Sequence, residues 1–249
     1  MKILKPIPKE THFILALILS FFLGTNALAA NAGDKDFEEF KNKGEGKKIL
    51  IIGANGSVAK VAIDAFLKNT KVDLKLYLRN AKRLESLKSP RVELIEGDGL
   101  DIQKLKSAMK GVDVVYANLA GDLPKLAQSI ITAMKETGIK RLIWISSFGV
   151  YNESYPEIPE YELNRIRAYI PPHIEAVKLI EASDLDYTII RAEWFSSKDE
   201  IDYELTKKGE AFKNPSALIS RKSIAHLIIR LSLEPNFGIR ESFGINKPE

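Results

Sequence analysis

The sequence predicts an α/β fold with a doubly wound parallel sheet, and three observations support that prediction. Short apolar runs alternate with amphipathic segments from residue 47 onward, which is the pattern of strands that alternate with helices. The connections between these segments are short, as expected for right-handed crossovers between neighbouring parallel strands. The apolar run at residues 112–117 is interrupted only by Asp113, as expected for a strand that helices cover on both faces.

The predicted elements follow one another in regular order. Gly138 fits a helix C-cap, and Asp98 or Asp101 fits the N-cap of a helix at residues 101–109. Residues 151–172 are polar and contain prolines, so we expect a loop or lid over the carboxyl edge of the sheet, where such folds bind ligands. The predicted strands are residues 49–52, 74–78, 92–95, 112–117, 141–146 and 186–190; the predicted helices lie directly after the first strand and at residues 81–87, 101–109, 123–135, 174–182 and 220–233.

A glycine turn, GANGSVA at residues 53–59, follows the first predicted strand. Gly53 lets the chain turn sharply, Gly56 leaves no Cβ where the backbone must approach phosphates, and Ala59 lets the next helix pack closely. The unpaired N–H groups and the positive dipole end of that helix form an anion site. The spacing is G-x-x-G-x-x-A, so a turn that only joins a strand to a helix is the alternative. The motif predicts a dinucleotide site held by Gly53, Asn55, Gly56, Ser57 and Val58.

The residues that follow the next strands indicate which dinucleotide binds. An NAD site usually offers a carboxylate after the second strand, whereas this chain offers Arg79, with Arg83 four residues later. A guanidinium pairs with a 2′-phosphate, so we expect NADP(H) in preference to NAD(H); a solvated helix start is the alternative. Asp98 is expected near the adenine unless it only caps a helix. Asn118 and Ala120 follow the fourth strand, where we expect the nicotinamide ribose.

Taken together, these segments resemble the NmrA-like, atypical short-chain dehydrogenase/reductase family, which has a Rossmann fold and binds NAD(P). The similar segments are IIGANGSVAK, LYLRNAKRL, VELIEGDGLD, VDVVYANLAG, GIKRLIWISSFGVY and EASDLDYTIIRAEWF, which occur in the family's order and cover most of residues 47–246. The resemblance implies a Rossmann sheet, usually NADP(H), and members that are reductases, isomerases or redox sensors.

The resemblance also implies a proton relay that this chain carries incompletely. Catalytic members use a serine with a Tyr-x-x-x-Lys pair, in which the lysine lowers the pKa of the tyrosine. Ser146 or Ser147 matches the serine, and the tyrosine and lysine positions fall on Tyr169 and His173. A neutral histidine supplies less positive potential than lysine, and the two prolines between these residues argue against a regular helix turn.

Other assignments of the catalytic tyrosine stay open. Tyr161 with Arg165 is a second candidate pair, and Tyr151, near the serines, is a third candidate. Each of these tyrosines also fits a packing or lid role. Trp194 and Phe195 follow the sixth strand, and a core role suits them better than a place in the substrate pocket.

The beginning of the chain predicts export. A start with three lysines precedes an apolar run at residues 13–23, and residues 27–30 form an A-x-A type cleavage site. We expect residues 1–29 to be a cleaved signal peptide, residues 30–46 a polar tether and residues 47–249 the NAD(P)-binding domain, in a periplasmic protein. A misread leader, which would give a cytoplasmic or membrane-anchored protein, is the alternative.

Composition argues against several other kinds of site. The chain has no cysteine, which excludes disulfides and thiolate metal sites, and its three histidines are scattered, so we expect no metal site. The leader carries three lysines and one glutamate, so its removal lowers the formal net charge from +4 to +2. That charge gives no indication of nucleic acid binding, and we expect no membrane span once the leader is cleaved.

These observations lead to one expected function and two alternatives. We expect an NAD(P)H-binding protein that works as an NADP(H)-dependent oxidoreductase or epimerase-like enzyme on a small carbonyl substrate. The alternatives are a non-catalytic NADP(H) sensor without a complete relay, and an exported scaffold that has lost the cofactor. Export conflicts with the cofactor, because a chain secreted unfolded carries no nucleotide across the membrane.

Overall fold

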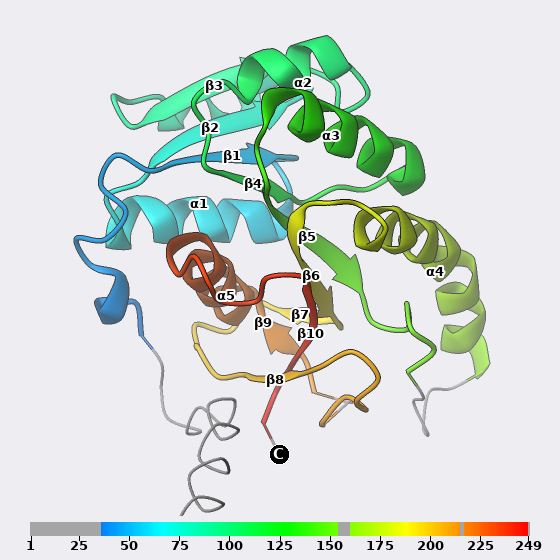
Figure 1. The fold of residues 1–249 in the computed structure, drawn as a ribbon. Helices are drawn as coiled ribbons and strands as arrows, with labels where there is room; N and C mark the ends of the chain where they lie inside the picture. Colours follow the sequence, from blue (N-terminus) through cyan, green and yellow to red (C-terminus); the bar gives the residue numbers. More distant parts are fainter. Residues whose placement is uncertain (1–35, 154–159, 215–216, 249) are drawn as a thin grey trace, which may run out of the picture. The chain divides into compact units, whose positions relative to one another are not determined.

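The computed structural model describes residues 36–153, 160–214 and 217–248. Within them, eight strands form one sheet in the order β3-β2-β1-β4-β5-β6-β10-β8 (Figure 1). Every neighbouring pair is parallel except β10 and β8, so the predicted doubly wound parallel sheet is confirmed and gains one antiparallel edge strand. The strands are β1 (Lys48–Ile52), β2 (Asp73–Leu78), β3 (Val92–Glu96), β4 (Val114–Ala117), β5 (Arg141–Ser147), β6 (Asp186–Ala192), β8 (Glu204–Thr206) and β10 (Glu241–Asn246).

Helices cover both faces of the sheet (Figure 1). The face of α1 and α5 buries Ile49 and Ile51 of β1, and the face of α2, α3 and α4 buries Leu50 and Ile52, which explains why this strand is apolar at every one of these positions. No helix within the described residues is long and apolar enough to cross a membrane. The helices are η1 (Glu38–Phe40), α1 (Ser57–Asn69), η2 (Ala81–Leu87), α2 (Ile102–Ala108), α3 (Leu123–Thr137), α4 (Glu160–Glu181) and α5 (Arg221–Leu233).

Helix ends fall at residues that the sequence indicates. Of the two candidate caps for α2, Asp101 accepts a hydrogen bond from the Lys104 N–H at 3.0 Å. The Asp98 carboxylate instead accepts from the Leu100 N–H at 2.9 Å and closes the turn before the helix. Gly138 adopts a φ of +77° and ends α3, as predicted.

The prediction that residues 151–172 form a loop is wrong for its second half. α4 begins at Glu160 and contains both prolines, Pro171 and Pro172. The φ angle of proline suits a helix, and the backbone hydrogen bonds lost there are offset by the apolar face that α4 packs against α3 and β5. Tyr169 and His173 therefore lie one helical turn apart, contrary to the expected irregularity.

The C-terminal strands are absent from the sequence prediction. β10 contains Gly244, a residue depleted in strands, yet a Cβ there would lie 2.4 Å from Thr206 Oγ1 and 2.8 Å from the Phe212 ring. β8, β7 (Phe195–Ser196) and β9 (Ile219–Ser220) have only two or three residues, too few to show a period. Residues 154–159 of the predicted loop lie outside the described residues.

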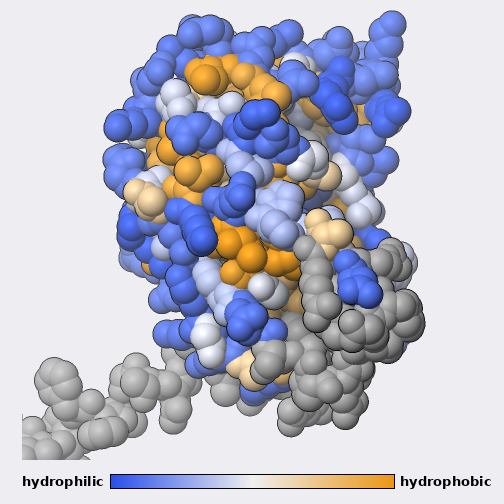
Figure 2. All heavy atoms as spheres, turned by 90° about the vertical axis from the view of Figure 1, so that its right-hand side faces the viewer, coloured by the Kyte–Doolittle hydropathy of each residue, from blue (hydrophilic) through white to orange (hydrophobic). Residues whose placement is uncertain are grey.

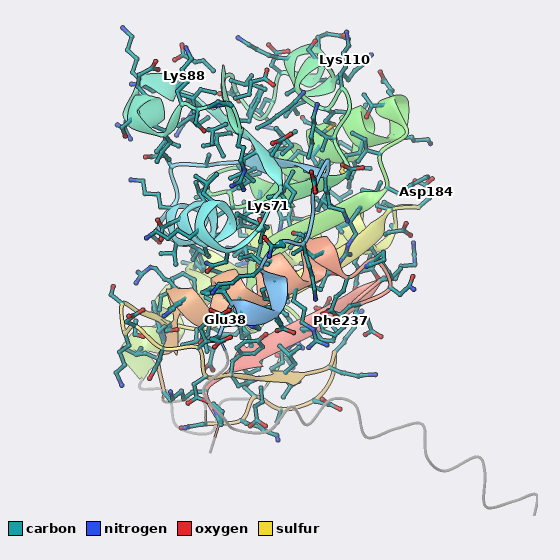
Figure 3. The ribbon with its side chains drawn as sticks, turned by 90° about the vertical axis from the view of Figure 1, so that its left-hand side faces the viewer. Glu38, Lys71, Lys88, Lys110, Asp184 and Phe237 are labelled. Carbon is teal, nitrogen blue, oxygen red and sulfur yellow. The ribbon has the colours of Figure 1, made fainter. Side chains whose placement is uncertain are left out.

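Part of the predicted tether packs on the domain. The rings of Phe37 and Phe40 lie 5.5 and 5.1 Å from the ring of His226 on α5, and Phe40 is fully buried. Figure 3 shows η1, with Glu38 labelled, lying against α5. The packed part of the chain therefore begins before residue 47.

Candidate functional site

The glycine turn joins β1 to α1. It lies at the edge of the sheet beside the pair β1 and β4, where the strand order reverses. Gly53 adopts a φ of +82°, and its N–H donates to the Tyr77 carbonyl at 2.9 Å. A Cβ on Gly53 would lie 2.1 Å from the Asn118 carbonyl oxygen, and a Cβ on Gly56 would lie 2.0 Å from the Asn118 side-chain nitrogen. Both glycines are therefore required by the segment that follows β4, besides any need to approach a phosphate.

The first turn of α1 is suited to an anion. Gly56 occupies the N-cap position, and no side chain caps this helix of 13 residues. Ser57 and Val58 follow at its first two positions. The free N–H groups and the positive dipole end favour a negatively charged group, as the glycine motif predicts.

A cleft of about 600 Å³ opens over the glycine turn and the ends of β2, β3 and β4. Arg79 and Arg83 line it with exposed side chains, at the end of β2 and on η2. Their positive charges suit a phosphate group, which a carboxylate in the same place would repel. The predicted cofactor residues that line this first cleft are Gly53, Asn55, Gly56, Arg79, Arg83, Asp98, Asn118 and Ala120.

A second cleft of about 700 Å³ adjoins the first and shares Gly56, Asn118, Leu119 and Ala120 with it. Ser57 and Val58 line this second cleft, so every predicted cofactor residue lies in one of the two. Most of its remaining lining is apolar and comes from β5, β6, α4 and the segments that follow the two strands. Figure 2 shows apolar side chains gathered near the middle of the face that carries α3 and α4.

Three of the four predicted catalytic residues meet in the second cleft. The Ser146 hydroxyl on β5 lies 3.3 Å from Nδ1 of His173 on α4, and the ring centroids of His173 and Tyr169 are 4.6 Å apart. Burial lowers the pKa of His173 from 6.5 to about 4, so its imidazole is neutral at pH 7. Partial burial raises the pKa of the Tyr169 hydroxyl. Position 173 thus supplies no cation that would lower the tyrosine pKa.

The fourth predicted catalytic residue, Tyr151, lies elsewhere. Its hydroxyl donates to Glu181 Oε1 at 2.8 Å, and its ring contacts the guanidinium of the fully buried Arg191. Glu181 lies eight residues beyond His173 on α4, about 12 Å along the helix axis. Burial raises the pKa of Tyr151. The structure therefore gives Tyr151 a packing role and does not bring it to Ser146.

Other residues near the second cleft differ from expectation. Trp194 is 46% exposed and lines the cleft together with Phe195, so the expected core role is wrong for Trp194. Glu193, which the prediction did not include, also lines the cleft and is buried. The side chains of Tyr161 and Arg165 lie outside the described residues.

Tyr77 lines the first cleft and was not among the predicted site residues. The Tyr77 hydroxyl donates to the Asp98 carbonyl at 2.8 Å, and a Cβ on Gly97 would lie 2.2 Å from that hydroxyl. Tyr77 therefore fixes the segment that carries Asp98. The sequence signal that could have indicated Tyr77 is a tyrosine near the end of one strand combined with a glycine directly after the next strand.

The chain is similar to known NAD(P)-binding proteins over most of its length. The model of an NAD(P)H-binding family matches residues 53–235. A Rossmann-fold NAD(P)-binding family protein of Shigella flexneri has a solved structure that is 38% identical, covers 81% of this chain and 94% of its own, and superposes with a TM-score of 0.69. A short-chain dehydrogenase/reductase of Veillonella parvula, solved in complex with NADP, is 27% identical over 81% of this chain and 95% of its own, with a TM-score of 0.75.

Among curated proteins, an isoflavone reductase homologue of Nicotiana tabacum is 30% identical over 166 residues, which cover 61% of this chain and 50% of that relative. The chain spans about half the length of this relative. The chain therefore belongs to the NAD(P)H-binding family, of the NmrA-like, atypical short-chain dehydrogenase/reductase type. The glycine cradle, the uncapped start of α1 and the two adjoining clefts fit a nicotinamide dinucleotide.

Proposed function

We propose that this protein is an NADP(H)-dependent oxidoreductase that acts on a small carbonyl compound. The two adjoining clefts are the main support, because arginines line one end and Ser146, Tyr169 and His173 line the other. A bound nicotinamide dinucleotide would supply the hydride. Arg79 and Arg83 would pair with a 2′-phosphate, which favours NADP(H) over NAD(H). The NADP complex of the Veillonella relative supports the same preference.

The chain's own residues would share the work as follows. The glycine turn and the first turn of α1 would hold the pyrophosphate. The Ser146 hydroxyl would hold the substrate oxygen, and its contact with His173 would fix the orientation of both groups. Tyr169 lines the same cleft as Ser146 and is 59% exposed, and it would exchange a proton with the substrate oxygen.

Relatives support this class of reaction. They include an isoflavone reductase homologue of Nicotiana tabacum, an NAD(P)H azoreductase of Xenophilus azovorans and an uncharacterised sugar epimerase of Bacillus subtilis. An epimerase-like reaction, in which the hydride returns to the same substrate, uses the same site and is included in the proposal.

A second candidate function is a non-catalytic NADP(H) sensor, and the histidine at position 173 favours it. A fluorescence titration with NADPH, run beside NADPH consumption over a panel of carbonyl compounds, separates the two. The oxidoreductase predicts saturable binding and turnover of at least one compound. Binding with no turnover across the panel would favour the sensor, and no binding would contradict both.

We also propose that residues 1–29 are a cleaved signal peptide and that the mature protein is periplasmic. The lysine-bearing start, the apolar run and the A-x-A site support this. N-terminal sequencing of the native protein tests it: a start near residue 30 is expected. An intact residue 1 would instead indicate a cytoplasmic or membrane-anchored protein.

A further inference from the structure

Arg191 on β6 is a fully buried side chain that the proposed reaction does not use, and it does not belong to the lining of either cleft. Resting on the proposed function, we propose that Arg191 is a positioning residue for the substrate end of the second cleft, where Ser146 lies. Its buried ion pair with Glu153 would fix residues 148–153, the segment that brings Phe148 into the wall of that cleft.

The guanidinium of Arg191 joins three segments that are distant in the sequence. Its Nη1 donates to Glu153 Oε1, its Nη2 donates to the Lys207 carbonyl at 2.9 Å, and its Nε donates to Ser242 Oγ at 3.2 Å. These partners lie after β5, after β8 and on β10. A planar, forked cation can bond to all three at once, whereas the single ammonium group of a lysine could not.

The ion pair is shielded from water. The side chains of Arg191 and Glu153 are 0% and 2% exposed, and the rings of Tyr151 and Phe212 lie 5.3 and 5.2 Å from the guanidinium carbon. The second carboxylate oxygen of Glu153 accepts from the Tyr151 N–H at 3.1 Å. Loss of either partner would leave a buried charge without its counterion, so Glu153 is held firmly in place.

The segment from residue 148 to residue 153 depends on this anchor. Gly149 and Asn152 adopt φ angles of +82° and +58°, and the Asn152 N–H donates to the Gly149 carbonyl at 3.1 Å. A left-handed conformation at Asn152 costs free energy, because this residue has a Cβ. The ion pair of Glu153, one residue later, offsets that cost and fixes the end of the turn.

The start of the same segment belongs to the substrate end. The Phe148 N–H donates to the Ala192 carbonyl at 3.2 Å, and the Phe148 ring meets the Trp194 ring edge to face, with centroids 6.5 Å apart. Ser146, two residues earlier, is the register partner of Arg191 in the pair of β5 and β6. Arg191 therefore fixes the chain on the far side of the cleft wall, and a displacement of about 1 Å among reacting groups slows a reaction strongly.

Quenching of tryptophan fluorescence by acrylamide tests the positioning without turnover. The two tryptophans are Trp144, which is 1% exposed, and Trp194, which is 46% exposed, so acrylamide quenches mainly Trp194. We expect Arg191→Lys and Glu153→Gln each to raise the quenching constant about twofold, because Trp194 would be nearly fully exposed without its contact to Phe148.

Arg141→Lys is the matched control. Arg141 is also a buried arginine, which donates to Thr188 Oγ1 at 2.7 Å and to the Asp186 carbonyl at 2.9 Å, but it begins β5 at the opposite edge of the sheet from the clefts. This change should lower the unfolding free energy and leave the quenching of Trp194 unchanged. Quenching that rises equally in the control, or that stays unchanged in Glu153→Gln, would overturn the inference.

Kinetics test the same residues in the proposed reaction. NADPH oxidation is measured with the carbonyl compound of the panel that the unmodified protein reduces fastest. We expect Arg191→Lys and Glu153→Gln to lower kcat at least about tenfold while the Kd for NADPH stays within about twofold, and Arg141→Lys to change neither. An unchanged kcat in folded Glu153→Gln would overturn the inference. If the unmodified protein reduces no compound, the oxidoreductase is contradicted, and the quenching result decides the role of Arg191 in the fold of the cleft wall.

Discussion

The first cleft and the proposed substrate end of the second cleft, where Ser146, Tyr169 and His173 lie, are built by different means. The first cleft is formed mainly by backbone. Its two glycines let the segment after β4 pack against the glycine turn, and the start of α1 offers N–H groups. In the second, side chains from β5, α4 and the segment after β6 come together. A cofactor site made from backbone tolerates changes at most neighbouring side chains, whereas the chemistry of the substrate end changes with a single residue such as His173.

The largest expected effect is on the glycine turn, the part of the first cleft that is formed by backbone. Gly56→Ala places a methyl group where the Asn118 side chain now lies, 2.0 Å away, so either the turn or Asn118 must move. We expect the Kd for NADPH to rise at least about 100-fold in a fluorescence titration. Gly209→Ala is the control: its φ is +85° but its Cβ would meet nothing within 4 Å, so only stability should fall. Unchanged NADPH binding by a folded Gly56→Ala protein would contradict this account of the turn.

A smaller effect is expected for the charge that selects the dinucleotide. Arg79→Asp replaces a cation by an anion beside the proposed 2′-phosphate, so we expect the Kd for NADPH to rise about 30-fold and that for NADH less than about threefold. Lys88→Asp makes the same change of charge at an exposed site that does not line the first cleft, and should leave both constants unchanged. Equal weakening of both nucleotides by Arg79→Asp would sink the NADP(H) assignment.

The next effect concerns His173 in the second cleft and is seen in how the unfolding free energy depends on pH. Folding lowers the pKa of His173 from 6.5 to about 4. Between pH 6.5 and pH 4, the imidazole is therefore protonated in the unfolded chain but neutral in the folded chain. Its contribution to stability is therefore complete above about pH 6.5 and falls as the pH falls. We expect a loss of about 2 kcal/mol at pH 5 in urea denaturation, which His173→Gln should remove. An imidazole that titrates near pH 6.5 by NMR would contradict the buried neutral state.

The smallest expected effect separates Tyr151 from the substrate end. Tyr151→Phe removes the hydrogen bond to Glu181, so we expect a loss of about 1 kcal/mol of unfolding free energy. The Kd for NADPH and the rate of NADPH oxidation should stay within about twofold, because Tyr151 does not line the second cleft. A loss of turnover above tenfold in a stable protein would show that the hydroxyl acts in the reaction.

The same difference explains how much could be predicted from the sequence. The glycine turn and the strands up to β6 follow from local patterns, so the sheet could be predicted directly, and the ten residues proposed to hold the cofactor all line one of the two clefts. The resemblance to the NmrA-like family pointed to Tyr169 and His173. Their meeting with Ser146 depends on α4 starting at Glu160 and continuing through two prolines, which local propensity argues against.

Long-range packing accounts for what was missed. Gly244 in β10 is explained by Phe212 and Thr206 beside it, and the role of Tyr77 by Gly97, which directly follows the next strand. Trp194 looks like a core residue in sequence because large aromatic side chains usually are buried, and only the assembled cleft shows its exposure.

One titration tests the central claim most directly, namely that the turn at Gly53 and Gly56, with Arg79 nearby, holds a phosphorylated adenine dinucleotide. NADPH and NADH are titrated side by side into the purified, folded protein, and bound nucleotide is followed by its fluorescence. The account predicts saturable NADPH binding, at least about tenfold tighter than NADH. No binding of either nucleotide at millimolar concentration, or tighter binding of NADH, would contradict it.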